Sequence, residues 1–287
     1  MRLSRGVISF LFLLPALAIY GIFTLAPLFY NMALSTLDIT GPGIYTYAGV
    51  NNYIELVKDP IFHTALLHNI IWVVLTLIFP MLVGLILATF STKVKGNTLI
   101  ITTYFIPRAI PFVVSGVIWS LMYNPIFGPL HFLLQGLGLE YLERPWLGDS
   151  KTALYALNFA GGWTFFGFCS LIFFNALQNV DPRLYEAAEI DGASSWQRFI
   201  HITLPSLRDA IIFLTFYSTI TAMSFFDLVH ITTRGGPGYA TEILSTYIYR
   251  LVFREGRLGY GSSICVILTL LTLLITAFIL SIQWREK

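Results

Sequence analysis

Two charged residues lie inside long apolar stretches, where a charge is costly enough to mark a candidate functional site. Arg108 lies in the apolar run 98–123, between Pro107 and Pro111, and Asp227 lies near the end of a later run. A charged side chain at the centre of a bilayer costs roughly 2.5–3.5 kcal/mol on insertion scales. Arg108 is therefore a candidate contact for a polar or anionic substrate or, equally, half of a structural pair. For Asp227, which is closer to the interface, a structural role is favoured.

The two prolines beside Arg108 predict that its helix is broken. Proline lacks an amide hydrogen, and its ring clashes with the carbonyl group of the preceding turn. Non-helical backbone at membrane depth is tolerated only where it is buried in protein or lines a cavity. The stretch from Pro107 to Pro111 is therefore predicted to be bent and to line a cavity.

Hydroxyl, amide and aromatic side chains recur on one face of each of two further apolar runs. They are Ser218, Thr221 and Phe225 in the run 210–231, and Asn158 and Phe165 in the run 153–177. Spacings of three, four and seven residues place side chains on a common helix face. Such a set suits a sugar, whose ring has polar rims and apolar faces. Helix packing is the competing interpretation of each residue alone, because small and hydroxylated residues also allow helices to approach closely.

Motifs for catalysis and for metal binding are missing from the sequence. It contains no H-E-x-x-H, G-x-S-x-G or C-x-x-C, and without a Gly-Lys dipeptide it has no phosphate-binding loop G-x-x-x-x-G-K-[ST]. His63 and His68 are five residues apart, which places them off a common helix face and argues against a metal site. Cys169 and Cys265 lie in apolar runs and imply no disulfide framework. The chain is not expected to be an enzyme.

Composition places the chain among membrane proteins. Of its 287 residues 56% are hydrophobic and 11% charged, which leaves too little polar surface for a soluble globule. A membrane-spanning helix needs roughly 20 mostly apolar residues. Six runs qualify, at about 7–30, 65–90, 98–123, 153–177, 210–231 and 259–282. The expected fold is an all-α membrane protein with six transmembrane helices in a single domain, 1–287. The net charge of +2, without a basic run, argues against a nucleic-acid partner.

The first of these runs is expected to be a retained span. Arg2 and Arg5 precede it, and Ala16-Leu17-Ala18 resembles the cleavage site of a signal peptide. The apolar character nevertheless continues to Tyr30, which gives a full span.

A polar segment between the fourth and fifth runs predicts two short helices. Asp181-Pro182 is a sound helix start, because the carboxylate can accept amide hydrogens and proline suits the first helical position. One helix then covers Leu184 to Ile190, and Gly192 can adopt the left-handed conformation that ends it. A second helix is expected to begin at Ser194 or Ser195 and to stop at Leu204, because Pro205 disfavours helical geometry in the preceding residue.

This segment resembles the EAA loop of the membrane subunits of ATP-binding cassette (ABC) importers, which inserts into a cleft on the ATPase subunit. The resemblance rests on the spacing Glu186-Ala187-Ala188-x-x-x-Gly192, nine residues, then Ile202-x-Leu204-Pro205. Thr233-Arg234-Gly235-Gly236-Pro237 and Asn124-Pro125 with Gly128 are similar to the carbohydrate permease branch of these importers, of the maltose and glycerol-phosphate type. The resemblance implies a type I ABC importer permease fold, with a cytoplasmic coupling loop over 178–209.

The family role implied by the resemblance is transport of a carbohydrate, a polyol or a polyol phosphate by alternating access. Its implied partners are a second homologous permease subunit, two ATP-binding subunits and an extracytoplasmic solute-binding protein. ATP and magnesium would be bound by the ATPase subunits, so no cofactor is expected in this chain. The substrate path would contain Arg108, Asn158, Phe165, Ser218, Thr221 and Phe225.

Short basic segments predict the orientation in the cytoplasmic membrane. Lys and Arg are enriched in short cytoplasmic segments near span ends. Basic residues occur in Met1 to Arg5, in the tight loop Ser91 to Asn97 and in Arg285 to Lys287. Together with the resemblance of the Glu186 loop, this places both termini and that loop in the cytoplasm.

Two questions stay open at the level of sequence. In the segment 240–255, an apolar stripe of Ile243, Leu244, Tyr247, Ile248, Leu251 and Val252 could rest on lipid or receive a partner.

The alternative function is an ion-coupled secondary transporter that uses Arg108 and Asp227 as a charge relay. The scarcity of carboxylates in the apolar runs argues against that function.

Overall fold

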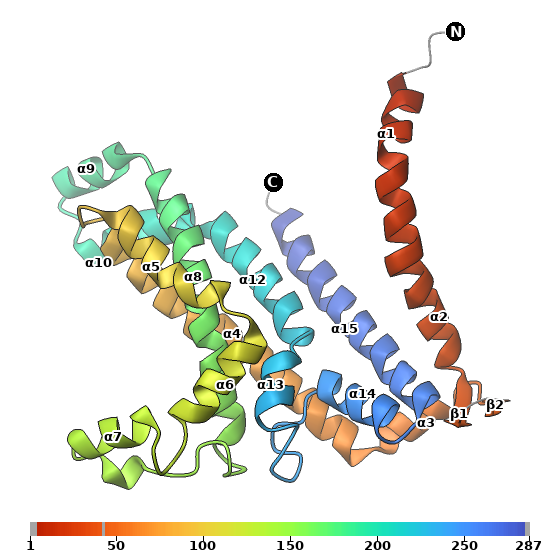
Figure 1. The fold of residues 1–287 in the computed structure, drawn as a ribbon. Coiled ribbons are helices and arrows are strands. Elements are labelled where there is room, and N and C mark those ends of the chain that lie inside the picture. Colours follow the sequence, from red (N-terminus) through yellow and green to blue (C-terminus); the bar gives the residue numbers. More distant parts are fainter. Residues whose placement is uncertain (1–4, 42–43, 285–287) are drawn as a thin grey trace. The chain divides into compact units, whose positions relative to one another are not determined.

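The computed structural model describes residues 5–41 and 44–284, most of which are helical (Figure 1). The chain packs as two compact units, which are described separately. One unit comprises Met1–Phe62 and Tyr247–Leu270, and the other comprises His63–Thr246 and Leu271–Lys287.

Five helical stretches among the described residues are long and apolar enough to cross a membrane, and a bent helix pair could form a sixth span. The five are Phe10–Leu34, Pro60–Ser91, Ala153–Gln178, Arg208–Thr232 and Leu258–Ser281. The bent pair is α5 (Asn97–Ala109) with α6 (Phe112–Met122). These stretches fall on the six apolar runs of the sequence, so the expected all-α membrane fold is confirmed.

The bent pair departs from a straight span by 94° at the residues next to Arg108. Ile110 is extended, with φ −81° and ψ 126°, and Pro111 follows as the residue before α6. Proline disfavours helical geometry in the residue before it, which accounts for the end of α5. Pro107 lies inside α5, so Pro111 alone makes the break.

The fifth span is also interrupted, which the sequence did not predict. Helix α12 covers Arg208–Met223 and α13 covers Asp227–Thr232. The break leaves the carbonyl group of Phe225 without a helical partner, and the hydroxyl group of Ser245 donates to it over 2.5 Å. A side chain from a distant segment therefore stabilises the break.

Helix α8 (Ala153–Gln178) is the central element of the His63–Thr246 unit, with 61% of its most apolar stretch buried. It contacts α5, α6, α12 and α13. At Gly167 a Cβ atom would lie only 1.8 Å from the carbonyl oxygen of Tyr104 on α5. Only glycine permits the two backbones to approach this closely, so any larger residue would push α5 away from α8.

Shorter elements lie at the two ends of this unit (Figure 1). At one end are α7 (Pro129–Gly136) and a 3₁₀ turn, Glu140–Leu142. At the opposite end are α9 (Pro182–Ile190) and α10 (Ser195–Arg198).

The other unit begins with an apolar helix and a small hairpin. Helix α1 (Arg5–Tyr20), a π-helical turn (Gly21–Leu25) and α2 (Ala26–Leu34) run continuously, and none of the most apolar stretch of Phe10–Leu34 is buried. Strands β1 (Leu37–Gly41) and β2 (Ile44–Tyr47) pair antiparallel, with Leu37 opposite Tyr47. In α3 (Asn51–Lys58), the buried Asn52 donates to the carbonyl groups of Ser35 and Leu37, each over 2.9 Å.

Asp59 joins the start of α4 (Pro60–Ser91) to α14 (Leu244–Phe253) and α15 (Leu258–Trp284). One carboxylate oxygen accepts the amide hydrogen of Ile61 over 2.8 Å, which caps α4. The other accepts the hydroxyl groups of Tyr247 and, over 2.6 Å, of Tyr260. Burial opposes the charge of Asp59, but these hydrogen bonds outweigh it and lower the pKa of the carboxyl group.

Four of the six residues in the apolar stripe of the segment 240–255, Ile243, Leu244, Tyr247 and Leu251, are buried inside the protein, while Ile248 and Val252 are half-buried. Ile243, at 0% exposure, belongs to a core cluster with Trp72 and Leu157. Leu251, at 1% exposure, and Val252 lie against Gly261 of α15. The buried part of the stripe therefore rests on other helices of this chain, which neither of the two interpretations from the sequence included. Amphipathic periodicity identifies an apolar face but not what covers that face.

We predict that Asp59→Asn lowers the stability of the purified protein far more than Glu55→Gln does. Asp59 accepts hydrogen bonds as an anion, and bonds to charged groups contribute about 1.5–3 kcal/mol each. Glu55 pairs with Arg257 at 2.7 Å, but its side chain is 51% exposed, and exposed pairs contribute less than about 1 kcal/mol. Thermal unfolding in detergent at neutral pH measures the difference, and equal losses in the two variants would contradict it.

The lowered pKa of Asp59 predicts a pH dependence of stability with a definite sign. Because folding lowers the pKa of Asp59, its contribution is complete above the ordinary carboxyl value of 3.8 and is lost as the pH falls through the lower folded value. The stability difference between the wild type and Asp59→Asn should thus shrink as the pH falls below that range.

Candidate functional site

Four helical segments that are distant in sequence enclose a narrow cavity of about 20 Å³ beside the break in the third span. Half of its eight lining residues are aromatic, and two carry hydroxyl groups. The lining residues are Trp72, Thr76, Phe112, Gly161, Phe165, Thr221, Ala222 and Phe225. The ring of Phe225 lies 4.7 Å from that of Trp72 and 5.0 Å from that of Phe112, centroid to centroid. A planar, partly apolar group could stack in such a lining.

Three residues predicted for a substrate path line this cavity. Two more lie next to lining residues, one through hydrogen bonds and one in the neighbouring turn of the same helix. Phe165, Thr221 and Phe225 line it directly. The buried Asn158 donates to the carbonyl group of Trp72 and to the hydroxyl group of Thr76, each over 3.3 Å, and so positions two lining residues. Ser218 lies one turn before Thr221 on α12. It is fully buried, and its hydroxyl group has no hydrogen-bond partner among the described residues.

Sequence reasoning missed five of the eight lining residues, among them Trp72, Thr76 and Phe112. Trp72 and Thr76 are four residues apart on α4, and Phe112 begins α6. The spacing of Trp72 and Thr76 could have placed them on one face. Tertiary packing decides that this face lies toward α8 and α12. The sequence pattern alone does not show which helices pack together.

Arg108, the sixth predicted residue, lies in the last turn of α5, immediately before the break. Its guanidinium carbon is 5.7 Å from the ring centroid of Phe112 and 5.6 Å from that of Phe165, two rings that also line the cavity. The rings of Phe168 and Tyr217 lie at 5.8 and 6.0 Å. One guanidinium nitrogen donates to the hydroxyl oxygen of Tyr217 over 2.8 Å. Aromatic faces attract a cation, so this cluster stabilises the charge without a carboxylate.

The charge relay of the alternative function is not assembled in the structure. Asp227 is exposed at the start of α13. Within the described part of the chain, Arg108 makes no salt bridge, to Asp227 or to any other carboxylate.

The short helices after α8 begin and end much as predicted. The carboxylate of Asp181 accepts the amide hydrogen of Arg183 over 2.9 Å and so caps α9. Gly192 has a φ of +77°, and the amide groups of Gly192 and Ala193 donate to the carbonyl groups of Glu189 and Ala188. This is the Schellman pattern that ends a helix on a left-handed glycine.

Helix α10 begins as predicted but its end was predicted wrongly. Ser194 caps it in a reciprocal pair with Gln197. The chain then continues through a π-helical turn, Phe199–Thr203, into α11 (Leu204–Ser206). Leu204 is helical, with φ −63° and ψ −43°, although Pro205 follows it. The amide group of Leu204 donates to the carbonyl group of Phe199 and closes a π turn, which is wider than an α-helical turn. The chain thereby stays helical up to Pro205, although proline has no amide hydrogen to donate.

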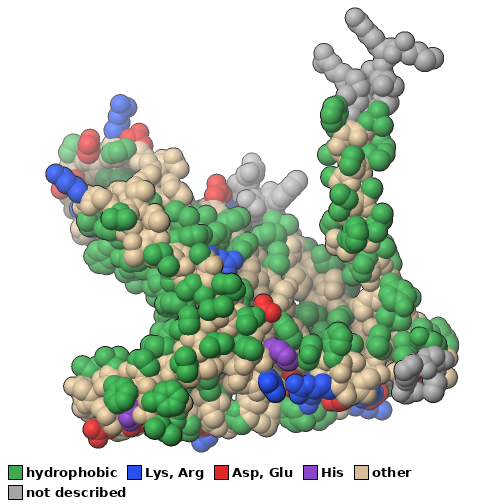
Figure 2. Space-filling view, viewed as in Figure 1, with side chains coloured by type: hydrophobic (Ala, Val, Ile, Leu, Met, Phe, Trp, Pro, Cys, Tyr) green, Lys and Arg blue, Asp and Glu red, His purple; other side chains and the backbone are tan. Residues whose placement is uncertain are grey.

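Contacts between its own side chains stabilise the hairpin of α9 and α10, and its tip is exposed. Arg198 and Glu189 form an ion pair at 2.9 Å, and Tyr185 and Thr203 share a hydrogen bond of 2.9 Å. Glu186, Ala187 and Gly192 are exposed. The same is true of two large apolar residues, Ile190 at 87% and Trp196 at 69%. Figure 2 shows charged side chains of both signs on this end of the unit. An exposed tip with large apolar side chains is typical of a protein contact site.

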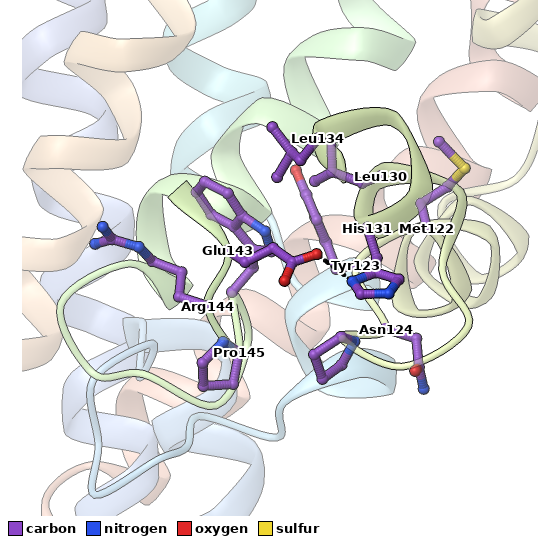
Figure 3. A pocket seen from close by; sticks show the side chains of 11 residues that line it. Met122, Tyr123, Asn124, Leu130, His131, Leu134, Glu143, Arg144 and Pro145 are labelled. Carbon is purple, nitrogen blue, oxygen red and sulfur yellow. Dashed lines mark ion pairs between the residues drawn. The ribbon is translucent and has the colours of Figure 1, made fainter. Parts of the chain in front are cut away.

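Another cavity, of about 220 Å³, lies at the opposite end of the unit, near α7 (Figure 3). Figure 3 shows the carboxylate of Glu143 pointing toward the ring of His131, with which it forms an ion pair. Tyr123, Leu130 and Leu134 also line it. No cluster of three metal-ligating side chains occurs here or elsewhere in the described ranges. His68 instead contacts the carbonyl group of Glu242, at 2.9 Å.

Comparisons with known proteins identify the family. Residues 80–283 match the model of the binding-protein-dependent transport system inner membrane component family. The chain is 36% identical to the probable ABC transporter permease protein YurN of Bacillus subtilis, covering 94% of each chain. It is 32% identical to the lactose transport system permease protein LacF of Rhizobium radiobacter, covering 92% of this chain and 89% of LacF. It is 30% identical to the trehalose/maltose transport system permease protein MalF of Thermococcus litoralis, covering 98% and 95%.

A solved structure gives the fold. A chain of the bacterial alginate ABC transporter, in complex with an alginate pentasaccharide-bound periplasmic protein, superposes with a TM-score of 0.84 at 22% identity, covering 99% of this chain and 96% of that one. The chain therefore belongs to the binding-protein-dependent transport system inner membrane component family, a family of transporter permeases, and has the fold of a type I ABC importer permease.

Proposed function

We propose that the chain is the membrane-spanning permease subunit of an ATP-driven importer for a carbohydrate or a related polyol or polyol phosphate. The observation that carries the proposal is the capped and exposed hairpin of α9 and α10 at one end of an apolar helical unit. A transporter driven by ATP needs a nucleotide-binding site, and this sequence lacks the phosphate-binding loop. The hairpin is the means by which a separate ATPase would drive this chain.

The hairpin is proposed to be the coupling loop. Its docking residues are Glu186, Ala187, Ala188, Gly192, Ile202, Leu204 and Pro205. Small residues at Ala187 and Ala188 let another protein approach α9 closely. Ile190 and Trp196 offer apolar surface to bury in a cleft, and Glu186 would pair with a basic residue of the ATPase. The fixed turn at Gly192 holds the two short helices in one arrangement, so movement of the ATPase would be transmitted to the spans.

The partners and orientation follow from the same proposal. Residues 1–287 act as one transmembrane domain in the cytoplasmic membrane, with both termini and the hairpin on the cytoplasmic side. Two ATP-binding subunits bind ATP and magnesium there, and a second homologous permease subunit completes the pore. An extracytoplasmic solute-binding protein delivers the substrate at the opposite end, near α7. The periplasmic protein in the complex of the alginate transporter supports this last partner.

The substrate path is proposed to pass the cavity at the break between α5 and α6. LacF and MalF, by their names, are permeases for lactose and for trehalose and maltose, which supports a carbohydrate substrate. The lining supports it too, because the ring faces of Trp72 and Phe225 suit the apolar faces of a sugar, and Thr76 and Thr221 supply hydroxyl groups. A cavity of about 20 Å³ is too small for a sugar, so it would have to widen. In alternating access, rocking of the helices would open this cavity to one side at a time.

Gly192→Asp and Glu186→Lys are predicted to abolish transport while leaving membrane insertion intact. A carboxylate at the left-handed turn and a reversed charge on α9 would both oppose docking of the ATPase. Uptake of radiolabelled maltose and lactose, and recovery of the ATPase with the tagged permease, measure the effect. Glu140→Lys, the same charge reversal at an exposed position beside α7 and far from the hairpin, is the matched control and should leave recovery of the ATPase unchanged. Normal uptake by both hairpin variants would refute the docking role.

Phe225→Ala is predicted to reduce uptake at least tenfold without loss of the bound ATPase. The change removes a ring that packs against Trp72 and lines the cavity, and a loss of about 1.4 kcal/mol corresponds to a factor of ten. Phe278→Ala, at a ring that is 66% exposed on α15, is the control. Equal effects of the two substitutions would show that Phe225 has no special part in the substrate path.

A further inference from the structure

The charge of Arg108 is stabilised only in part by this protein. Its guanidinium group donates one hydrogen bond, to Tyr217, and lies over four aromatic rings. Cation–π contacts stabilise such a charge only modestly. In the described ranges the group has no carboxylate partner. A guanidinium group has five N–H donors and stays charged in proteins, so most of its hydrogen-bonding capacity is left unused by the described residues.

The position of Arg108 directs this capacity toward the proposed substrate path. The side chain is only partly buried, and it lies at the end of α5 beside the 94° bend. Phe112 and Phe165, two of the four rings it contacts, also line the cavity. The guanidinium group therefore lies against the wall of the cavity, on two of the rings that form it.

The chemistry of a guanidinium group selects an anion. Its planar fork matches the two oxygens of a carboxylate or a phosphate, and such charge-assisted bonds are about twice as strong as neutral ones. In an apolar surrounding the attraction is stronger than in water. A neutral sugar would need no permanent cation, because hydroxyl and amide groups such as those of Thr76 and Asn158 satisfy its hydroxyl groups.

We propose that the transported sugar carries an anionic group, a carboxylate or a phosphate, which Arg108 binds while the sugar ring stacks on the aromatic lining. This inference rests on the proposed function and names the substrate class of the same site. Tyr217 is a positioning residue, because its hydroxyl group holds one edge of the guanidinium fork and leaves the others for the ligand.

The test uses three probes that share one ring and differ only at carbon 6: glucose, glucuronate and glucose 6-phosphate. Binding of each to the complete purified importer is measured by quenching of tryptophan fluorescence and, independently, by thermal shift. We expect at least one charged probe to bind at least tenfold more tightly than glucose. A preference for glucuronate would identify a uronate-type substrate, and a preference for glucose 6-phosphate a sugar phosphate.

Substitutions at Arg108 distinguish a role in ligand binding from a purely structural role. Arg108→Gln should remove the preference for the charged probe over glucose, whereas Arg108→Lys should keep part of that preference, because a charge remains without the planar fork. A purely structural role predicts instead that Arg108→Gln weakens all three probes alike and lowers the unfolding temperature.

Three results would overturn the inference. They are equal binding of glucose and both charged probes, an unchanged preference in Arg108→Gln, and no binding of any probe. Uptake of neutral sugar by the intact importer in those cases would leave the proposed function standing. Failure of the reconstituted complex to take up any saccharide with ATP would instead refute the proposed function itself.

Discussion

The backbone restriction that Pro111 imposes on Ile110 is the constraint on which the candidate site depends. Ile110 is extended before Pro111, and the third apolar run therefore forms two helices at a steep angle in place of one straight span. The bend sets Arg108 at the end of one helix and Phe112 at the start of the next, with both near Phe165 of α8. A straight helix would place Arg108 and Phe112 on one continuous face. The cavity exists because the chain turns at this point.

Helix α8 connects the cavity to the hairpin. Gly161 and Phe165 line the cavity, while Phe174 and Leu177, farther along the same helix, line a second cavity of about 520 Å³ beside the hairpin. Twelve residues of helix separate Phe165 from Leu177, a distance of about 18 Å at 1.5 Å per residue. A buried, uninterrupted helix transmits displacement along its axis with little loss, because close packing resists compression. The contact of Gly167 with α5 fixes the broken span to the same helix.

The sequence was sufficient for the helical class, for the apolar runs and for the caps at Asp181, Gly192 and Ser194, because each depends on residues close together in the chain. It also indicated the break beside Arg108. It was insufficient wherever distant segments decide the outcome. The interruption at Phe225 depends on a hydroxyl group from Ser245. The end predicted at Leu204 is overridden by a π turn. Trp72 and Thr76 became part of the candidate site only when α4 was placed against α8 and α12.

Helix α4 is longer than a bilayer requires, and this has a consequence for the lipid around it. Its 32 residues extend for about 48 Å, whereas the hydrocarbon core of a typical membrane is about 30 Å thick. A helix that is longer than the hydrocarbon core is accommodated by tilting, or its ends lie among the lipid headgroups. Because Trp72 is carried on α4, the depth of its indole relative to the headgroups varies with acyl-chain length. Lipid composition is thereby expected to act on the geometry of the candidate site.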